Sequence, residues 1–166
     1  MCEGGRGGCG SSLTNIDLPR ACLEGKLDSL DFSSILSLTH LHLHHNNLLG
    51  PIPPSIGSLT NFISLDLAYN RMMCNLPLSL ANLSQFLELD LSNNEFQGSI
   101  PMELGNLCSI VHLRVYTNQL TSFIHSSLGN LTKLHTLYLR RISLYGTILE
   151  EIGNLIYLTH LTFSFI

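Results

Sequence analysis

The chain has 166 residues, a formal charge of −4, 45% hydrophobic residues and 12% charged residues. This length permits one domain with a sizeable core, and a charged fraction well below the ordinary value of about 25% argues against disorder. The 8 basic residues stand against 12 acidic ones, which disfavours a nucleic-acid surface. The 35 leucines, about a fifth of the chain, indicate a repeated core.

Membrane and export signals are absent from the sequence as written. No apolar run reaches the roughly 18 residues of a spanning helix, because Ser, Thr, Asn or His interrupts every leucine cluster. The first residues, Met1 to Arg6, lack the basic segment and the apolar segment that together mark a secretory signal. We therefore expect neither a transmembrane helix nor a signal peptide in this chain.

An internal repeat of 24 residues runs through most of the chain. Four equally spaced asparagines mark it: Asn46, Asn70, Asn94 and Asn118. Each belongs to a segment of the form L-x-L-x-x-N-x-L, the first of which runs from Leu41 to Leu48. A fifth copy, Leu137–Leu144, keeps the apolar positions but has Ile142 in place of the asparagine, and a sixth begins at Leu161.

The repeat predicts a particular local structure. Each L-x-L segment should form a short strand whose leucines point inward while the residue between them faces solvent. One unit cannot bury its apolar edge alone, so successive strands should stack into a parallel sheet on the inner side of a curved solenoid. A buried asparagine after each strand can satisfy N–H and C=O groups of its own and neighbouring turns, so we expect the four asparagines to form a structural ladder.

The second half of each repeat is equally regular. It occupies Gly50–Leu59 and Gly98–Leu107, with a looser copy at Gly146–Leu155. The resulting pattern, L-x-G-x-I-P-x-x-I-G-x-L, resembles the plant-specific class of leucine-rich repeat found in the ectodomains of receptor-like Ser/Thr kinases. The resemblance implies an α/β repeat fold: a leucine-rich-repeat solenoid, built as a right-handed superhelix, with a short parallel sheet on its concave face and loops or 3-10 turns on its convex face.

The same resemblance divides the chain in two. Residues 36–166 contain five repeats of 24 residues plus a truncated sixth, and residues 1–35 contain a cap-like segment and a degenerate first repeat. Cys2 and Cys9 are similar to the paired cysteines of the N-terminal cap in secreted plant receptors, which implies a disulfide between them. The cysteines without a partner by spacing are Cys22, Cys74 and Cys108.

The solvent-facing strand positions form the predicted binding surface, because the inward positions are committed to the core. With strands about 4.8 Å apart, Asp66 should lie beside Asp90, and Asp90 opposite Arg114. A peptide with a basic group toward one end and an acidic group or carboxylate toward the other fits this polarity. The alternative is a solvated face whose ion pairs contribute about 0–1 kcal/mol each. The predicted ligand-binding residues are His42, Asp66, Glu88, Asp90, Arg114, Tyr116, Tyr138 and Arg140.

A histidine cluster adjoins this surface at His40, His42, His44 and His45. Alternate spacing places the first three imidazoles on one face, where two could share a zinc or copper ion. No acidic residue lies in the same strand to support such a site. We therefore expect no metal and no other cofactor, and we interpret the cluster as exposed imidazoles that titrate near about pH 6.5.

Neither hydrolase nor kinase signatures occur in the sequence, so no enzyme activity and no catalytic residue are predicted. The segment Gly5–Gly10 matches G-x-G-x-x-G, but it neither follows a predicted strand nor opens a helix, which argues against a nucleotide site. Two N-glycosylation sequons, at Asn82 and Asn130, share one phase of the repeat on the convex side, where they should be exposed.

The resemblance implies a binding module. The chain is expected to be a fragment of a plant receptor-like kinase ectodomain that perceives signals at the extracellular face of the plasma membrane. Its implied partners are a peptide or protein ligand and a co-receptor, with no nucleic acid and no direct membrane contact. The family's kinase domain is absent from this chain. The alternative is a stand-alone secreted inhibitor or adaptor, similar to the polygalacturonase inhibitors.

Overall fold

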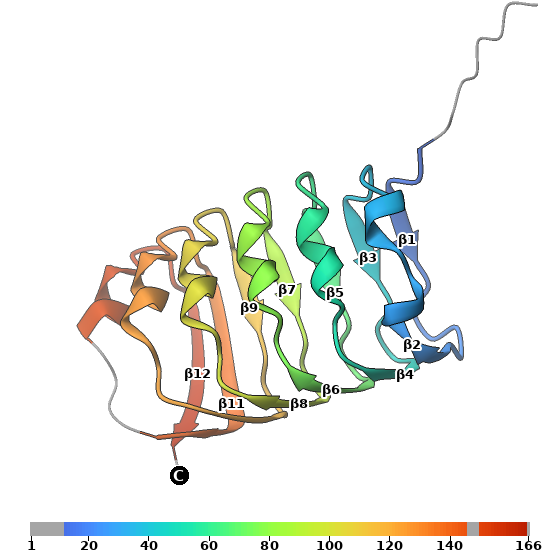
Figure 1. The fold of residues 1–166 in the computed structure, drawn as a ribbon. Coiled ribbons are helices and arrows are strands. Elements are labelled where there is room, and N and C mark those ends of the chain that lie inside the picture. Colours follow the sequence, from blue (N-terminus) through green and yellow to red (C-terminus); the bar gives the residue numbers. More distant parts are fainter. Residues whose placement is uncertain (1–11, 146–149, 166) are drawn as a thin grey trace, which may run out of the picture.

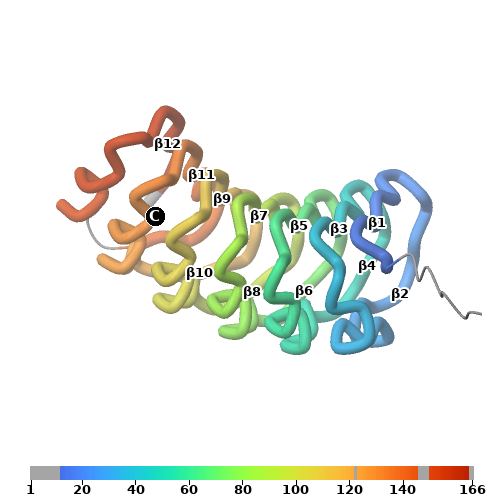
Figure 2. The backbone as a smooth tube through the Cα atoms, turned by 90° about the horizontal axis from the view of Figure 1, so that it is seen from above, coloured from blue at the N-terminus to red at the C-terminus, as the bar shows by residue number. Residues whose placement is uncertain are grey.

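The computed structural model describes residues 12–145 and 150–165, which form a curved solenoid of stacked turns (Figure 1). Each full turn passes through a short strand, a second short strand and a 3-10 helix before the next turn begins. Seen from above, the stack forms an arc with the strands β1, β3 and β5 and their successors on the inner side (Figure 2). Every helix within the described ranges is a 3-10 helix.

The concave sheet is parallel and takes one strand from each turn. Its strands are β1 (Asn15–Asp17), β3 (His40–His42), β5 (Ser64–Asp66), β7 (Glu88–Asp90), β9 (His112–Arg114), β11 (Thr136–Leu144) and β12 (His160–Phe165). Residues one repeat apart lie opposite each other, so Leu41 pairs with Leu65 and Leu65 with Leu89. The solenoid with a parallel sheet, which the repeat predicts, is confirmed.

A second parallel ladder runs along the outer half of the turns, where the sequence predicted only loops and 3-10 turns. Its strands are β2 (Glu24–Lys26), β4 (Asn47–Gly50), β6 (Arg71–Asn75), β8 (Glu95–Gly98) and β10 (Gln119–Ser122). β11 is nine residues long and joins the two ladders, because it pairs with β9 at its start and with β10 near its end. This long strand contains Ile142, which replaces the ladder asparagine.

The 3-10 helices cover the side of the stack that faces away from the concave sheet. They are η1 (Leu27–Ser29), η2 (Phe32–Ser34), η3 (Pro54–Ser58), η4 (Leu78–Asn82), η5 (Met102–Asn106), η6 (Ser126–Asn130) and η7 (Glu150–Asn154). Neighbouring helices approach closely, and a Cβ atom at Gly105 would lie 2.5 Å from the backbone oxygen of Ser127. The glycine of the I-G-x-L motif therefore permits the turns to stack at this distance.

The core is a continuous apolar column between the two ladders and the 3-10 helices. In the first full repeat, the buried side chains are Leu41, Leu43, Leu48, Ile52, Ile56 and Leu59. Phe62 and Phe86, which are one repeat apart, stack with ring centroids 5.7 Å apart and are fully buried. Aromatic side chains thus continue the leucine column through the middle turns.

The four asparagines occupy equivalent positions after the concave strands and bond to two turns at once, with Asn70 and Asn94 buried and Asn46 and Asn118 partly buried. The Asn94 Oδ1 atom accepts a hydrogen bond from the Met72 N–H at 2.9 Å, and Nδ2 donates to the carbonyls of Leu67 at 2.9 Å and Leu91 at 3.2 Å. Equivalent contacts with the preceding turn are made by Asn46, Asn70 and Asn118. Each amide therefore satisfies backbone groups of two turns, and at Asn70 and Asn94 these groups would otherwise be buried without partners.

Cys74 and Ser122 stand where the repeat favours glycine, and the backbone at Cys74 keeps the glycine conformation. Gly50 and Gly98 are the last residues of β4 and β8 and have φ values of 75° and 73°. Cys74, at the same phase of the repeat, has a φ of 75°. A residue with a Cβ atom is strained in this left-handed region, at about 1–3 kcal/mol. Cys74 therefore keeps the backbone path of the repeat while carrying a side chain that the path does not favour.

We predict that Asn94→Ala lowers the free energy of unfolding by about 1–3 kcal/mol, because it leaves buried backbone groups of two turns without partners. Asn61→Ala is the matched control, since Asn61 is exposed in a turn and should change stability by less than about 0.5 kcal/mol. Urea unfolding of both variants gives the two values. Equal stability of the variants would contradict the structural role of the ladder.

Candidate functional site

The strands of the concave sheet carry two columns of side chains on the face away from the core; register fixes their order, and all but Ser64 and Thr136 are at least partly exposed. The first column runs through His40, Ser64, Glu88, His112, Thr136 and His160. The second runs through His42, Asp66, Asp90, Arg114, Tyr138 and Thr162. Tyr116 lies two residues beyond the end of β9, and Arg140 lies within β11. All eight residues predicted to bind a ligand therefore lie on this one face.

Acidic groups occupy the middle of the face. Asp66 and Asp90 lie opposite each other on β5 and β7, and Asp90 lies opposite Arg114 on β9. The guanidinium of Arg114 bonds more closely to Glu88, however, at 2.8 Å from Nη1 to Oε1, than to Asp90, at 3.8 Å from Nη1 to Oδ2. The Arg114 guanidinium thus reaches diagonally to Glu88, a contact that strand order alone does not specify.

The local environment shifts the pKa values of the two neighbouring carboxyl groups in opposite directions. Burial raises the pKa of Asp90, with a smaller contribution from the charge of Asp66, and these effects outweigh the hydrogen bonds from Ser92 and the charge of Arg114. Burial also acts to raise the pKa of Glu88, but the hydrogen bond and charge of Arg114 outweigh it, so that pKa is lowered. Arg114 therefore stabilises one carboxylate more than the other.

His112 lies beside this ion pair. Burial lowers its pKa, and the charge of Arg114 lowers it further, although Glu88 acts in the opposite direction. This imidazole is consequently biased toward its neutral form. Its Nδ1 atom is buried without a hydrogen-bond partner within the described part of the chain.

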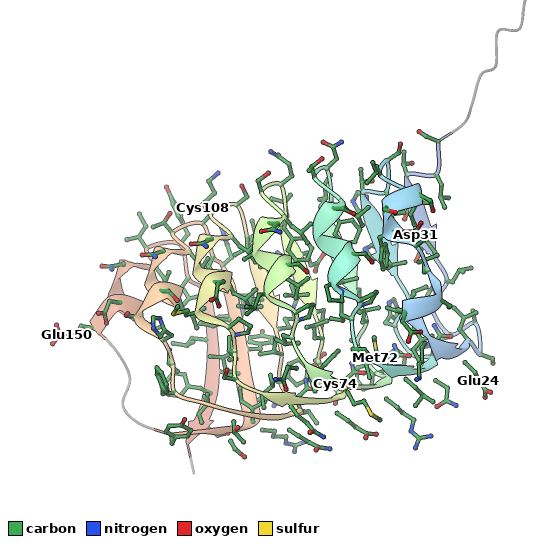
Figure 3. All side chains as sticks on the ribbon, viewed as in Figure 1. Glu24, Asp31, Met72, Cys74, Cys108 and Glu150 are labelled. Carbon is green, nitrogen blue, oxygen red and sulfur yellow. The ribbon has the colours of Figure 1, made fainter. Side chains whose placement is uncertain are left out.

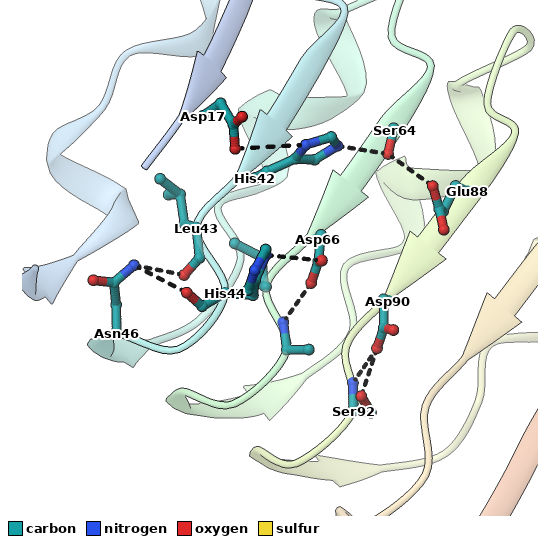
Figure 4. A network of polar contacts seen from close by, with 12 residues as sticks. Asp17, His42, Leu43, His44, Asn46, Ser64, Asp66, Glu88, Asp90 and Ser92 are labelled. Carbon is teal, nitrogen blue, oxygen red and sulfur yellow. Dashed lines mark hydrogen bonds and ion pairs between the residues drawn. The ribbon is translucent and has the colours of Figure 1, made fainter. Parts of the chain in front are cut away.

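A chain of polar contacts crosses the N-terminal half of the face (Figure 4). Nε2 of His42 lies 2.9 Å from the Ser64 Oγ atom, and that hydroxyl lies 3.4 Å from Oε2 of Glu88. Nδ1 of His42 faces Oδ1 of Asp17 at 3.9 Å. The contacts join four successive strands, from β1 to β7, and the shortest of them, between His42 and Ser64, orients the imidazole.

The order of Asp17, His42 and Ser64 is that of a hydrolytic triad, but the geometry is not. The 3.9 Å separation of His42 and Asp17 exceeds a hydrogen-bond distance, and Ser64 is only 5% exposed. The hydroxyl is therefore not presented to a substrate. The arrangement orients a histidine on a binding face and gives no support for catalysis.

The remaining two histidines of the cluster, His44 and His45, meet edge to face with ring centroids 5.5 Å apart, but each has a different further partner. Nδ1 of His44 lies 3.0 Å from Oδ2 of Asp66, whereas His45 turns onto Tyr69 and stacks on its ring at a centroid distance of 4.2 Å. No group of three or more His, Cys, Asp or Glu side chains is arranged to hold a metal ion in residues 12–145 and 150–165. The carboxylates that face His42 and His44 are Asp17 and Asp66. They come from neighbouring strands, so the sequence of the histidine segment alone does not reveal them.

The C-terminal half of the face is aromatic and basic. The rings of Tyr116 and Tyr138 meet edge to face with centroids 6.1 Å apart, and the guanidinium of Arg140 lies 5.3 Å from the centroid of Tyr116. Arg140 is exposed and has no carboxylate partner in the part of the chain that the structure describes. The face thus presents carboxylates in its middle and an accessible cation beside two aromatic rings at one end.

Comparisons with known proteins agree with this geometry. The family model described as Leucine Rich Repeat matches residues 37–59 and 85–107. The ectodomain of the Arabidopsis thaliana receptor kinase GASSHO1/SCHENGEN3, solved in complex with CASPARIAN STRIP INTEGRITY FACTOR 2, is 32% identical with a TM-score of 0.88, over 92% of this chain and 19% of that chain. The ectodomain of the Arabidopsis receptor kinase HAESA, solved with an IDA peptide hormone, is 30% identical with a TM-score of 0.86, over 93% of this chain and 26% of that chain.

The chain is a leucine-rich-repeat segment like those of plant receptor-kinase ectodomains. A second HAESA structure, with the hormone IDA and the co-receptor SERK1, is 27% identical with a TM-score of 0.78 and covers 93% of this chain. The leucine-rich-repeat segment spans 30% of that ectodomain, and less of the other two. No curated protein matches the sequence significantly.

Three other predictions for the leucine-rich-repeat segment concern glycosylation, a disulfide and membrane-spanning helices. Both sequon asparagines, Asn82 and Asn130, end 3-10 helices and are exposed. Cys2 and Cys9 lie outside the described residues. Among the described residues, no helix has the combined length and apolar character that crossing a bilayer requires.

Sequence reasoning did not identify a small cavity on the concave face of the segment. It has a volume of about 430 Å³. Its lining residues are His40, His42, Ile63, Ser64, Leu87, Glu88, Val111 and His112. The signal for it is the 24-residue spacing of Ile63, Leu87 and Val111, which places an apolar residue before each of three successive strands. A cavity that combines apolar and polar side chains in its lining is suited to receiving part of a ligand.

We predict that Glu88→Gln weakens the acid sensitivity of folding. The pKa of Glu88 is lowered in the folded protein, so its ionised form contributes stability above the unfolded pKa of about 4.3. This contribution is lost as the pH falls through the folded pKa. Between about pH 5 and pH 3, the melting temperature of the variant should therefore fall less than that of the original protein.

Glu95→Gln is the control for this measurement, because Glu95 makes only an exposed contact of 3.9 Å with Arg71. Its melting temperature should follow that of the original protein across the same pH range. If both substitutions reduce the acid sensitivity equally, the assigned role of the Glu88–Arg114 pair is wrong.

Proposed function

We propose that this leucine-rich-repeat segment binds an extended peptide along its concave face, as part of a receptor-like kinase ectodomain that perceives a signal outside the cell. The carrying observation is the charge order of the face. Register places Asp66 and Asp90 side by side near its middle, with Tyr138 farther along the same column and Arg140 next to it on β11. A chain crossing these strands meets carboxylates first and a cation last.

The acidic positions are suited to a basic ligand group. The side chains of Asp66 and Asp90 are 27% and 16% exposed, so each is partly dehydrated but can be reached from solvent. Arg114 is already hydrogen-bonded to Glu88, which leaves the negative charge of the aspartates only partly compensated. A Lys or Arg of the ligand would complete the charge balance.

The other end is suited to a carboxylate or acidic side chain. Arg140 is held over the Tyr116 ring without a carboxylate partner among the described residues. The two tyrosines beside it offer rigid contact area at little cost in conformational entropy. A ligand with a basic group toward one end and a carboxylate toward the other therefore matches the face in both charge and order.

The comparisons support this class of ligand. GASSHO1/SCHENGEN3 was solved in complex with CASPARIAN STRIP INTEGRITY FACTOR 2, and HAESA with the peptide hormone IDA and the co-receptor SERK1. By this similarity, we propose a peptide ligand and a co-receptor protein as partners of the present segment, at the extracellular face of the plasma membrane. No nucleic acid and no direct membrane contact form part of this proposal, and neither does catalysis.

A secreted chain should also be glycosylated. Asn82 and Asn130, with the sequon hydroxyls of Ser84 and Thr132, are all exposed on the side of the 3-10 helices. We predict that the chain, expressed behind a signal peptide in plant cells, carries glycans at both sites. Peptide N-glycosidase should increase its electrophoretic mobility, with a smaller effect on Asn82→Gln or Asn130→Gln. A secreted double-sequon protein without any mobility change would contradict the prediction.

Peptide binding is tested by charge reversal. Linear peptides with free carboxylates are selected from a display library on the original protein, and their Kd values are then measured by calorimetry. We predict that Asp66→Lys combined with Asp90→Lys weakens binding at least about tenfold, because a basic ligand group then meets like charges.

The control is Glu150→Lys combined with Glu151→Lys, which makes the same charge change on η7 at the convex side. This variant should alter Kd by less than about twofold, since the reversed charges lie beyond the face that holds the peptide. Equal weakening by both double variants would locate the effect in net charge and would refute a concave binding site.

A further inference from the structure

An apolar groove lies on the outer side of the solenoid, separate from the concave face. Its volume is about 1080 Å³, and residues of four successive turns line it, from Pro51 to His125. The side chains that protrude most into solvent along it are Leu78, Met102 and Phe123, which are 60%, 55% and 51% exposed. The groove lies where the second ladder meets the first residues of the 3-10 helices.

The repeat itself generates the groove. Ile52, Leu76 and Ile100 are one repeat apart and form its buried floor. Pro54, Leu78 and Met102 follow two residues later in each turn, where the 3-10 helix begins, and all three are exposed. An exposed apolar side chain therefore recurs at the same place in successive turns, which distinguishes the groove from scattered surface residues.

The spacing of these side chains selects the shape of an occupant. Successive turns are separated by one strand spacing, about 4.8 Å. An α-helix lying along the groove repeats every 5.4 Å, so it drifts from the turns by only about 2 Å over three steps. An extended strand repeats a same-face side chain every 6.7 Å or so, and drifts by about 6 Å, more than one whole turn. A helix thus matches the ridges and a strand does not.

The charge at the groove selects the sequence of an occupant. Glu103 lines the groove, is partly buried, and has neither an ion pair nor a hydrogen bond with its side chain within residues 12–145 and 150–165. Among the described residues that line the groove, none is Lys or Arg. At the same phase two turns later stands Glu151, on η7. A basic side chain beside the apolar face of an occupant would therefore be complementary.

We propose that this groove binds an amphipathic α-helix of a partner protein, one that presents an apolar side chain on each turn and a Lys or Arg toward Glu103. The site is independent of the concave face. A peptide on the concave sheet and a helix in the groove would occupy opposite sides of the same turns, so both could bind at once.

Disulfide capture tests the proposal, because Cys74 lines the groove and is exposed. Two synthetic peptides of identical Leu, Lys and Cys content, each about four helical turns long, are incubated with the folded protein in a thiol–disulfide buffer. One places leucines at helical spacing and the other alternates leucine and lysine. Peptide mapping then measures the adduct at each cysteine of the described chain, with Cys108, on the opposite edge (Figure 3), and Cys22 as internal controls.

The expected result is at least about tenfold more adduct at Cys74 with the helical peptide than with the alternating one, and a similar excess over Cys108. Leu78→Lys and Met102→Lys should each reduce this capture, and Glu103→Lys should reduce it through charge repulsion. Leu36→Lys is the matched control, since Leu36 is 52% exposed and does not line the groove. The replaced side chains are exposed or partly buried at the surface, so unchanged melting temperatures should verify folding of each variant.

Three results would overturn the proposal. Equal capture of the two peptides would remove the helical selectivity, and capture unchanged by Leu78→Lys and Met102→Lys would place the peptide elsewhere. Sedimentation that shows a dimer, which Leu78→Lys dissociates, would make a second copy of this chain the occupant. Loss of peptide binding to the concave face leaves all of these measurements unaffected, so the two sites can fail separately.

Discussion

The side-chain hydrogen bonds of the four ladder asparagines hold neighbouring turns in one register. Both the concave face and the apolar groove depend on that register. Each amide joins the backbone of its own turn to that of the preceding turn, so the turns cannot slide without leaving buried groups unpaired. Because side chains one repeat apart are consequently adjacent, a residue choice made at one phase of the repeat becomes a row across the surface. The charge order of the concave face and the apolar groove are two such rows.

The sequence was sufficient for the solenoid and for the assignment of each residue to a row, because both follow from a period of 24 residues. It was insufficient for the second ladder, since the outer strands alternate between apolar and polar residues too briefly to be distinguished from turns. Individual side-chain contacts could not be predicted from the sequence either. Strand order places Arg114 opposite Asp90, whereas the length and rotamer of the arginine decide that it bonds to Glu88. Strand register follows the 24-residue repeat, whereas side-chain conformation does not.

The concave face combines groups that are already paired with groups that are available. Arg114 and Glu88 neutralise each other, and His42 is held by Ser64, so these residues contribute shape more than charge. Asp66 and Asp90 share a neighbourhood of negative charge, and the raised pKa of Asp90 reflects this together with its burial. Arg140 lies apart from any carboxylate among the residues described. The net attraction for a partner therefore originates from a few residues at defined positions.

The merging of the two ladders in β11 affects how the molecule can deform. Elsewhere along the arc, each turn connects the inner and outer strands through a corner whose positive-φ residue directly precedes the asparagine, and that asparagine bonds to the turn before it. In β11, Arg141 keeps this corner with a φ of 53°, but Ile142 replaces the asparagine and has no side-chain amide to bond to the preceding turn. The fifth turn is therefore joined to the fourth by backbone pairing and apolar packing without an amide bridge, so resistance to sliding between neighbouring turns differs along the solenoid.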